Sequence, residues 1–165
     1  SISEALIEAG RKANLDSYFI ASRLIQEQGK DGTTLSRGYE YNGTIVYNLF
    51  NIRATGNSQQ EIIQNAAQYA YEQGWNSVEK ALIGGVEFVK EGYINVGQNT
   101  LYLQKFDVVN QDDSLYTHQY MQNLLAPQSE ASNMKEIYEA SNTVDAPLNF
   151  IIPLYENMPQ EVSEQ

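Results

Sequence analysis

Apolar residues in the first third of the chain are spaced first for helices and then for a β-hairpin. A stripe over residues 2–13 recurs every three or four positions and predicts a short helix. Asp16 is suited to begin a second helix and Gly29 to end it, and apolar residues cover much of the circumference between them. Aromatic and apolar residues then alternate around Asn42 and Gly43, a dipeptide that favours the tight turn of a hairpin.

The remaining sequence predicts further helices and then an extended end. Ser58 and Glu61 form a capping box that begins a helix stopped by Gly74. Three prolines and an acidic end predict an extended strap and a frayed tail. We therefore expect a mainly α (α+β) fold, with one domain at residues 1–142 and a strap and tail at 143–165. The other predicted segments are a loop at 30–38 and helices at 77–92, 118–125 and 129–141. The short stretch at 100–107 has an ambiguous pattern that does not predict its secondary structure.

Composition narrows the possible chemistry. Of the 165 residues 42% are hydrophobic, enough for a core, and the formal charge is −11, from 10 Lys+Arg against 21 Asp+Glu. Such an acidic chain would repel a phosphate backbone, so no nucleic-acid partner is expected. The absence of cysteine and the single histidine, His118, exclude thiol catalysis and Cys- or His-cluster sites, so no metal or cofactor is expected. No segment approaches the roughly 20 apolar residues of a membrane span, so no membrane insertion is expected.

Glu27 is the first candidate for acid–base chemistry. It lies in the last turn of a mostly apolar helix, two residues before Gly29. The negative end of the helix dipole and partial burial both disfavour a charged carboxylate, and so favour the protonated form that a general acid requires. An ordinary solvated glutamate near a helix end would fit the same residues, so both interpretations stay open.

Glu40 is the second candidate, and alternation places it on the face of the hairpin opposite the tyrosines. If the hairpin folds over the helix end, Glu40 would face Glu27 across a groove, as paired carboxylates do in glycosidases. A strand glutamate that faces water is the alternative. Asp31 and Asp107 are weaker candidates, and His118 is expected to satisfy a local hydrogen bond. The 12 tyrosines suit either a sugar-binding groove or a tyrosine-rich core.

Six stretches of the chain form a set that is more specific than any of its members. They are 18–29 (YFIASRLIQEQG), the hairpin region 41–43 (YNG) with 46–52 (VYNLFNI), 69–75 (YAYEQGW), 81–85 (ALIGG), 97–102 (GQNTLY) and 117–121 (THQYM). In this order they resemble the glucosaminidase domains of glycoside hydrolase family 73, the autolysin type of Gram-positive bacteria. The resemblance covers roughly residues 2–125.

The resemblance implies a lysozyme-like helical fold with a small β-hairpin lobe beside the substrate groove. It also implies hydrolysis of the β-1,4 bond between N-acetylglucosamine and N-acetylmuramic acid, by a secreted, cell-wall-associated enzyme whose partner is the peptidoglycan glycan strand. By position, Glu27 would be the general acid, and Tyr120 would orient substrate or stabilise charge in the transition state. The matching segments assign substrate binding to Tyr47, Asn48, Phe50, Tyr102 and Gln119. A monomer is expected.

Two questions stay open within this interpretation. Residues 51–54 depart from the glycine-rich turn of many relatives, which leaves the local shape of the groove undetermined. The second catalytic group could be a hairpin carboxylate that activates water, or the acetamido group of the substrate. A muramidase, a lytic transglycosylase of similar fold and a non-catalytic glycan-binding module are the alternative functions.

Overall fold

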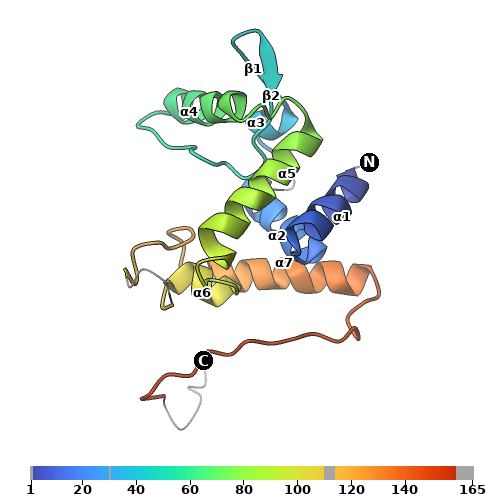
Figure 1. Cartoon of the computed structure of the whole chain (residues 1–165), viewed down its shortest axis with the longest axis vertical. Coiled ribbons are helices and arrows are strands. Elements are labelled where there is room, and N and C mark those ends of the chain that lie inside the picture. The colour runs from blue at the N-terminus through green and yellow to red at the C-terminus, as the bar shows by residue number, and fades with distance from the viewer. Residues whose placement is uncertain (1, 30, 110–113, 159–165) are drawn as a thin grey trace.

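The computed structural model describes residues 2–29, 31–109 and 114–158 and is mainly helical, with one hairpin at one end (Figure 1). This confirms the predicted fold class. The main helices are α1 (Ile2–Ala13), α2 (Ser17–Gln28), α4 (Gln59–Glu72), α5 (Val78–Val89) and α7 (Ala126–Ala140). Two short helices, α3 (Thr34–Arg37) and α6 (Leu101–Phe106), and a π-helical turn at Lys90–Ile94 complete the helical elements, and strands β1 (Tyr39–Tyr41) and β2 (Thr44–Val46) form the hairpin.

Helix α2 packs between other helices of the domain. Helix α1 packs against α2 and α5, while α7 packs against the other side of α2 and against α6. Two glycines of α5 lie against aromatic side chains: a Cβ added at Gly84 would meet the ring of Trp75 at 2.2 Å, and one at Gly85 would meet the ring of Phe50 at 2.1 Å. The two glycines therefore admit aromatic rings from the loops that precede α4 and α5.

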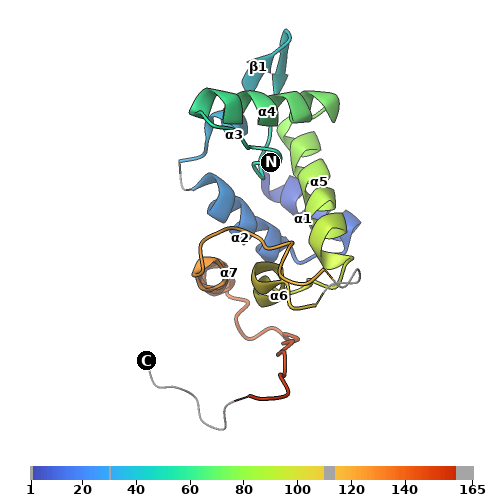
Figure 2. The ribbon, with the colours of Figure 1, turned by 90° about the vertical axis from the view of Figure 1, so that its left-hand side faces the viewer.

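The hairpin and α4 form a small lobe at the end of the molecule away from α7 (Figure 2). The strands pair antiparallel with Tyr39 opposite Val46, and the turn residues Asn42 and Gly43 have φ values of 49° and 73°. Two positive φ angles in a two-residue turn are those of a type I′ hairpin, as the dipeptide predicted. Val46 is buried, which connects the hairpin to the core.

The predicted helix at 118–125 is wrong, because this stretch is an irregular loop. Met121, within this stretch, has a positive φ of 59°, which a right-handed α-helix does not contain. The loop is instead fixed by tertiary hydrogen bonds: the Tyr120 amide donates to the Gln104 carbonyl at 2.8 Å, and the Lys105 ammonium donates to the Met121 carbonyl at 2.5 Å. Two smaller differences are α3, which lies in the predicted loop 30–38, and α6, which settles the stretch 100–107 as a helix capped by Thr100.

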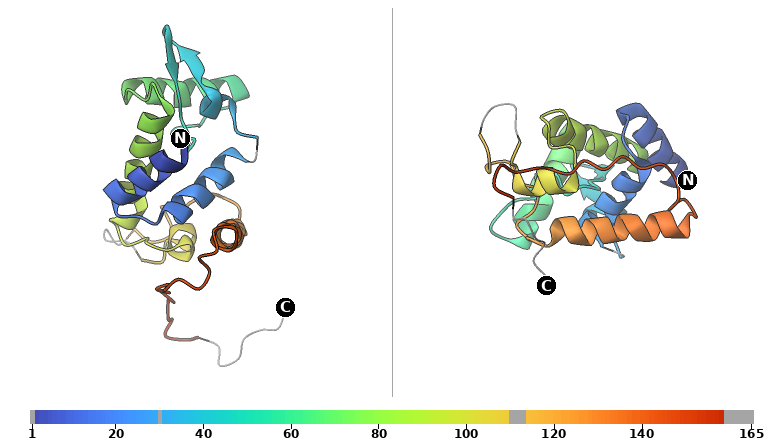
Figure 3. Two further views of the ribbon diagram at one scale, coloured as in Figure 1. Left: turned by 90° about the vertical axis from the view of Figure 1, so that its right-hand side faces the viewer. Right: turned by 90° about the horizontal axis from the view of Figure 1, so that it is seen from below.

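Residues 143–158 leave the end of α7, reverse direction and run back below α7 and α6 as an extended strap (Figures 1 and 3). Many of its apolar side chains are exposed, among them Phe150 at 80% and Leu154 at 82%. A hydrogen bond between the hydroxyls of Tyr155 and Tyr102, 2.7 Å apart, connects it to α6. Residues 143–158 form no helix or strand, and residues 159–165 lie outside the described part of the chain.

Candidate active site

Glu27 lies in the last turn of α2, where the ends of this helix place it. The Asp16 carboxylate accepts a hydrogen bond from the Tyr18 amide at 2.9 Å and begins the helix. Gly29, with a φ of 64°, follows the helix and donates its amide to the Ile25 carbonyl at 2.9 Å. Glu27 is half-buried and lines a cleft, so its carboxyl is held by the helix but reachable from outside.

Two side chains from distant segments hold the Glu27 carboxyl. The Tyr120 hydroxyl donates to its Oε1 at 2.5 Å, and the Asn51 amide donates to its Oε2 at 3.1 Å. Asn51 also donates to the Glu27 backbone carbonyl at 2.8 Å, and its φ of 51° is one that asparagine tolerates better than most residues. A protonated Glu27 could in turn donate to the phenol oxygen of Tyr120, so the same pair of atoms suits either protonation state.

Tyr120 is fixed from both sides by its neighbours. Its ring lies over the Arg23 guanidinium, with 3.7 Å from Cζ to the ring centroid, and it makes a T-shaped contact with the Tyr93 ring at a centroid distance of 6.2 Å. Burial raises the pKa of the Tyr120 phenol far above its ordinary value; Arg23 opposes the increase and the Glu27 carboxylate adds to it. Tyr120 is therefore a neutral hydroxyl at any physiological pH.

Arg23 lies one turn before Glu27 on α2 and is almost fully buried, at 1% exposure. Its Nε donates to the Glu130 carboxylate of α7 at 2.6 Å, and its Nη2 donates to the Gln104 side chain of α6 at 2.5 Å. Burial raises the pKa of the Glu130 carboxyl, and the Arg23 charge opposes that increase. The floor beneath Tyr120 is thus a buried ionic cluster that joins three helices.

The cleft beside Glu27 has a volume of about 570 Å³. Its walls include Arg23, Phe50, Asn51, Tyr93 and Tyr120. Among the described residues that line it, Glu27 is the one carboxylate. A second hollow of about 560 Å³, lined in part by Thr33, Arg37 and Gln59, adjoins this cleft at Asn51 and Ala54. The two hollows provide room for several consecutive rings of a polymer.

The structure brings Glu27, Tyr120 and Phe50 together in the cleft, but it places the other predicted site residues elsewhere. Glu40 is exposed on the hairpin opposite Ile45 and does not line the cleft. Asn48 is fully buried, where it accepts the Ile52 amide at 3.0 Å and donates to the carbonyls of Ile52 and Ala66. The remaining three are half-buried Tyr47 behind Gly38, Tyr102 near the strap, and exposed Gln119 in the loop before Tyr120.

His118 satisfies local hydrogen bonds, as predicted. Its Nδ1 lies 2.8 Å from the Gln98 side-chain oxygen, its amide donates to the Asp107 carboxylate at 2.8 Å, and its ring stacks on Tyr93 at 4.4 Å. Of the two weaker candidates, Asp107 is buried at the end of α6 and Asp31 is exposed before α3, and neither lines the cleft.

Sequence reasoning did not identify Arg23, Asn51 or Glu130 as site residues. Arg23 had a local signal, since a charge three residues after Ile20 falls on the apolar face of the predicted helix. Asn51 stood in the stretch that departs from a glycine-rich turn, and asparagine is the residue that most readily replaces glycine at positive φ. Glu130 had no signal, because nothing in the sequence around it marks a buried carboxylate.

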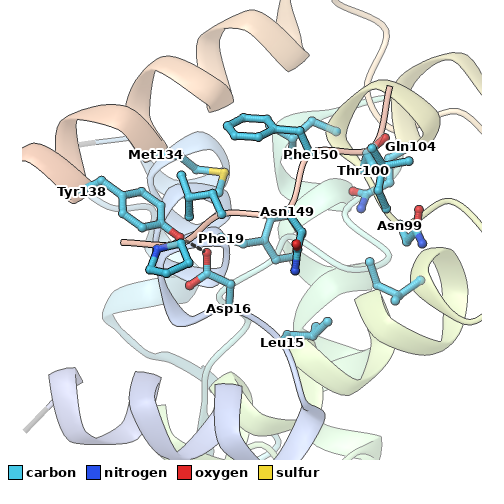
Figure 4. Close-up of a pocket in the computed structure, with 15 residues that line it drawn as sticks. Leu15, Asp16, Phe19, Asn99, Thr100, Gln104, Met134, Tyr138, Asn149 and Phe150 are labelled. Carbon is cyan, nitrogen blue, oxygen red and sulfur yellow. Dashed lines mark hydrogen bonds between the residues drawn. The ribbon is translucent and has the colours of Figure 1, made fainter. Parts of the chain in front are cut away.

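A different cavity, of about 540 Å³, lies at the opposite end of α2 (Figure 4). The strap covers it with Leu148 and Phe150, and Phe19 and Met134 lie on the domain side. At its edge the Tyr138 hydroxyl donates to the Asp16 carboxylate at 2.7 Å. This cavity is mostly apolar and does not include Glu27, so the cleft at the other end of α2 is the better site for acid–base chemistry.

In the described part of the chain, no group of three or more His, Cys, Asp or Glu is placed to hold a metal ion. No helix there is both long and apolar enough to cross a membrane.

Comparisons with known proteins identify relatives that are named as β-N-acetylglucosaminidases or bifunctional autolysins. No protein-family model matches the chain. A β-N-acetylglucosaminidase of Bacillus subtilis is 30% identical over 139 residues, which are 82% of this chain and 15% of that protein. A bifunctional autolysin of Staphylococcus epidermidis is 30% identical over 159 residues, which are 92% of this chain and 11% of that protein. The chain therefore spans less than a sixth of the length of these relatives.

The fold is that of autolysin structures. Autolysin E of Staphylococcus aureus, solved in complex with the muropeptide NAM-L-Ala-D-iGlu, matches with a TM-score of 0.69 and 23% identity over 84% of this chain and 60% of that chain. A catalytic mutant of the same protein, in which a glutamate is replaced by alanine, has been solved with the disaccharide NAG-NAM. By sequence and by fold, the chain belongs to the glucosaminidase domains of glycoside hydrolase family 73.

Proposed function

We propose that this domain is a peptidoglycan hydrolase that cleaves the β-1,4 bond between N-acetylglucosamine and N-acetylmuramic acid, with Glu27 as the general acid. The observation that carries the proposal is the hydrogen bond of 2.5 Å between Tyr120 and Glu27, the one carboxylate among the described residues that line the cleft. The names of the relatives, a β-N-acetylglucosaminidase and bifunctional autolysins, agree with this activity.

In the proposed reaction Glu27 gives its proton to the glycosidic oxygen as the bond to the anomeric carbon breaks. Positive charge then develops on the ring that keeps the anomeric carbon. While Glu27 is protonated, the Tyr120 hydroxyl is free to turn toward the sugar. Once the proton has left, the same hydroxyl can donate a hydrogen bond to the Glu27 carboxylate. Asn51 keeps the carboxyl in one orientation throughout.

Two groups are candidates for completing the hydrolysis: the Glu40 carboxylate and the acetamido group of the substrate. Glu40 could activate water if the hairpin closes over the cleft, which would give inversion at the anomeric carbon. The acetamido oxygen of the substrate could instead attack the anomeric carbon, and water would then open the resulting ring with overall retention. The exposure of Glu40 and its absence from the cleft lining favour the acetamido route. The anomeric form of the new reducing end, followed by NMR, separates the two routes, and Glu40→Gln would abolish activity only in the first.

The substrate-binding assignments are part of the same proposal. Phe50 lines the cleft directly, whereas Asn48 is proposed to act indirectly by fixing the loop that carries Phe50 and Asn51. Tyr47, Tyr102 and Gln119 would contact only the more distant parts of a long glycan strand. We also propose that residues 1–142 form the catalytic domain, that the protein is a monomer, and that it acts as a secreted, cell-wall-associated enzyme.

Digestion of purified peptidoglycan tests the proposal, with borohydride-reduced products analysed by mass spectrometry. We expect fragments that end in reduced N-acetylglucosamine, and a loss of activity of about 10²- to 10⁴-fold in Glu27→Gln. EDTA should leave the activity unchanged, because no metal is part of the mechanism. Ends in reduced muramic acid would indicate a muramidase, and anhydro ends a lytic transglycosylase. Full activity of Glu27→Gln would remove Glu27 from the mechanism, and an inactive wild-type domain would favour a glycan-binding module.

A further inference from the structure

We infer that Arg23 and Glu130 are positioning residues for the catalytic pair Tyr120–Glu27, so that helix α7 helps to set the geometry of the active site. This inference rests on the proposed function. Glu130 comes from α7, the helix that begins at Ala126 and packs against α2 and α6. Neither residue is proposed to touch the substrate.

Arg23 contacts the ring of Tyr120 directly. The guanidinium carbon lies 3.7 Å from the centroid of the Tyr120 ring, close enough for the flat cation to set the plane of the ring. The hydroxyl of that ring donates to Glu27 at 2.5 Å. A tilt of the ring would therefore move the hydroxyl away from the carboxyl, although the backbone of Tyr120 stayed in place.

Arg23 is itself held by side chains of two other helices. Its Nε donates to Glu130 at 2.6 Å, and its Nη2 donates to Gln104 at 2.5 Å, so α7 and α6 fix two edges of the guanidinium plane. Phe19, one turn earlier on α2, lies 5.1 Å from the guanidinium carbon. Arg23 and Glu130 are each only 1% exposed, which leaves little freedom for either side chain.

Stability alone gives no good reason for this arrangement. A buried ion pair can often be replaced by packed hydrocarbon without loss of stability, because both charges must leave water. Arg23 carries a further cost, since its Nη1 is buried and has no hydrogen-bond partner among the described residues. The position of the planar Arg23 guanidinium is explained if it supports the Tyr120 ring, which lies over it.

The test compares two glutamates of α7 that differ in their surroundings. Glu130→Gln keeps the shape of the side chain and removes the charge that orients Arg23. The matched control is Glu139→Gln, because Glu139 is exposed and pairs with exposed Lys135 at 3.7 Å on the same helix. With soluble glycan fragments as substrate, we expect Glu130→Gln to lower kcat about 10- to 100-fold with KM changed less than about twofold. Glu139→Gln should match the wild-type protein in both constants.

A double-mutant cycle distinguishes positioning from a general structural effect. In a Tyr120→Phe background the hydroxyl is already absent, so Glu130→Gln should lower kcat much less than it does in the wild-type protein. An equal loss in both backgrounds would overturn the inference, as would unchanged kcat in a folded Glu130→Gln variant.

Arg23→Lys decides the question if Glu130→Gln does not fold. Lysine keeps a charge for Glu130 but removes the flat group below Tyr120, so kcat should fall while KM holds, and an unchanged kcat would again overturn the inference. Thermal unfolding checks that each variant is folded. An inactive wild-type domain would overturn the proposed function and this inference together, whereas an active wild type with an equally active Glu130→Gln would overturn this inference alone.

Discussion

The two ends of α2 each carry a carboxylate that accepts a hydrogen bond from a tyrosine. At the N-terminal end, Tyr138 donates to Asp16 at 2.7 Å; at the C-terminal end, Tyr120 donates to Glu27 at 2.5 Å. The two ends differ in the field of the helix. The N-terminus of a helix stabilises a negative charge and the C-terminus destabilises it, each by a few tenths of a kcal/mol to about 1 kcal/mol.

This difference separates a structural carboxylate from a chemical one. Asp16 also accepts the Tyr18 amide and so completes the first turn of the helix, which is an ordinary capping function. Glu27 is not a cap of α2, and its negative charge is disfavoured by the dipole of this helix. It is held by residues from two other segments, Asn51 and Tyr120. A carboxyl that the fold keeps in place against the preference of its helix is the better candidate for proton transfer.

The largest contrast between the two ends is expected when one hydroxyl is removed at each end. Tyr120→Phe should lower kcat about 10- to 150-fold, because a hydrogen bond to a charged group is worth roughly 1.5–3 kcal/mol. Tyr138→Phe makes the same chemical change at the structural end and should leave kcat within about twofold of the wild type. Steady-state kinetics on soluble glycan fragments would measure both. Equal losses in the two variants would mean that the ends of α2 do not differ in function.

The next effect is on folding at the N-terminal end. Asp16→Ala removes the cap of α2 and should lower the free energy of unfolding by about 1 kcal/mol. Urea denaturation followed by circular dichroism would measure the loss. Ser77→Ala, which removes the cap of α5, is a suitable comparison, because both side chains accept an amide from the first turn. A stability unchanged by Asp16→Ala would contradict the structural assignment.

A smaller effect of opposite sign is expected at the C-terminal end. Glu27→Gln removes a negative charge from the negative end of the helix and should raise the free energy of unfolding by about 0.3–1 kcal/mol, although it lowers activity about 10²- to 10⁴-fold. The same urea experiment detects the gain. A loss of stability would show that the hydrogen bonds from Tyr120 and Asn51 to the charged carboxylate outweigh the helix dipole.

The smallest effect is a pH dependence at the Asp16 end. Burial, followed by the hydrogen bond to Asp16, raises the pKa of Tyr138 from 10.0 to about 12. The folded state therefore keeps a proton that the unfolded chain releases, so this contribution to stability is complete below pH 10 and is lost as the pH rises to about 12. Stability measured across this window should fall less steeply in Tyr138→Phe than in the wild type. Identical slopes would show that Tyr138 titrates alike in both states.

Local preferences made part of this structure predictable. Asp16 and Gly29 set the ends of α2, and Asn42 with Gly43 set the hairpin turn, because each signal acts on the backbone within a few residues. The helix at 118–125 was predicted by the same means and is wrong, since the Tyr120 amide and the Met121 carbonyl bond to residues of α6. Local preference decides only where no tertiary partner competes for the same groups.

The sequence by itself determined that a glutamate stands at the end of an apolar helix beside a hairpin, and the resemblance assigned its function. Only the tertiary structure decided what holds that glutamate. The bonds of Glu27 to Asn51 and Tyr120 span 24 and 93 residues, and the Arg23–Glu130 pair spans 107. Contacts over such separations follow from how α2, α6, α7 and two loops pack together, and no spacing within a single helix or strand encodes them.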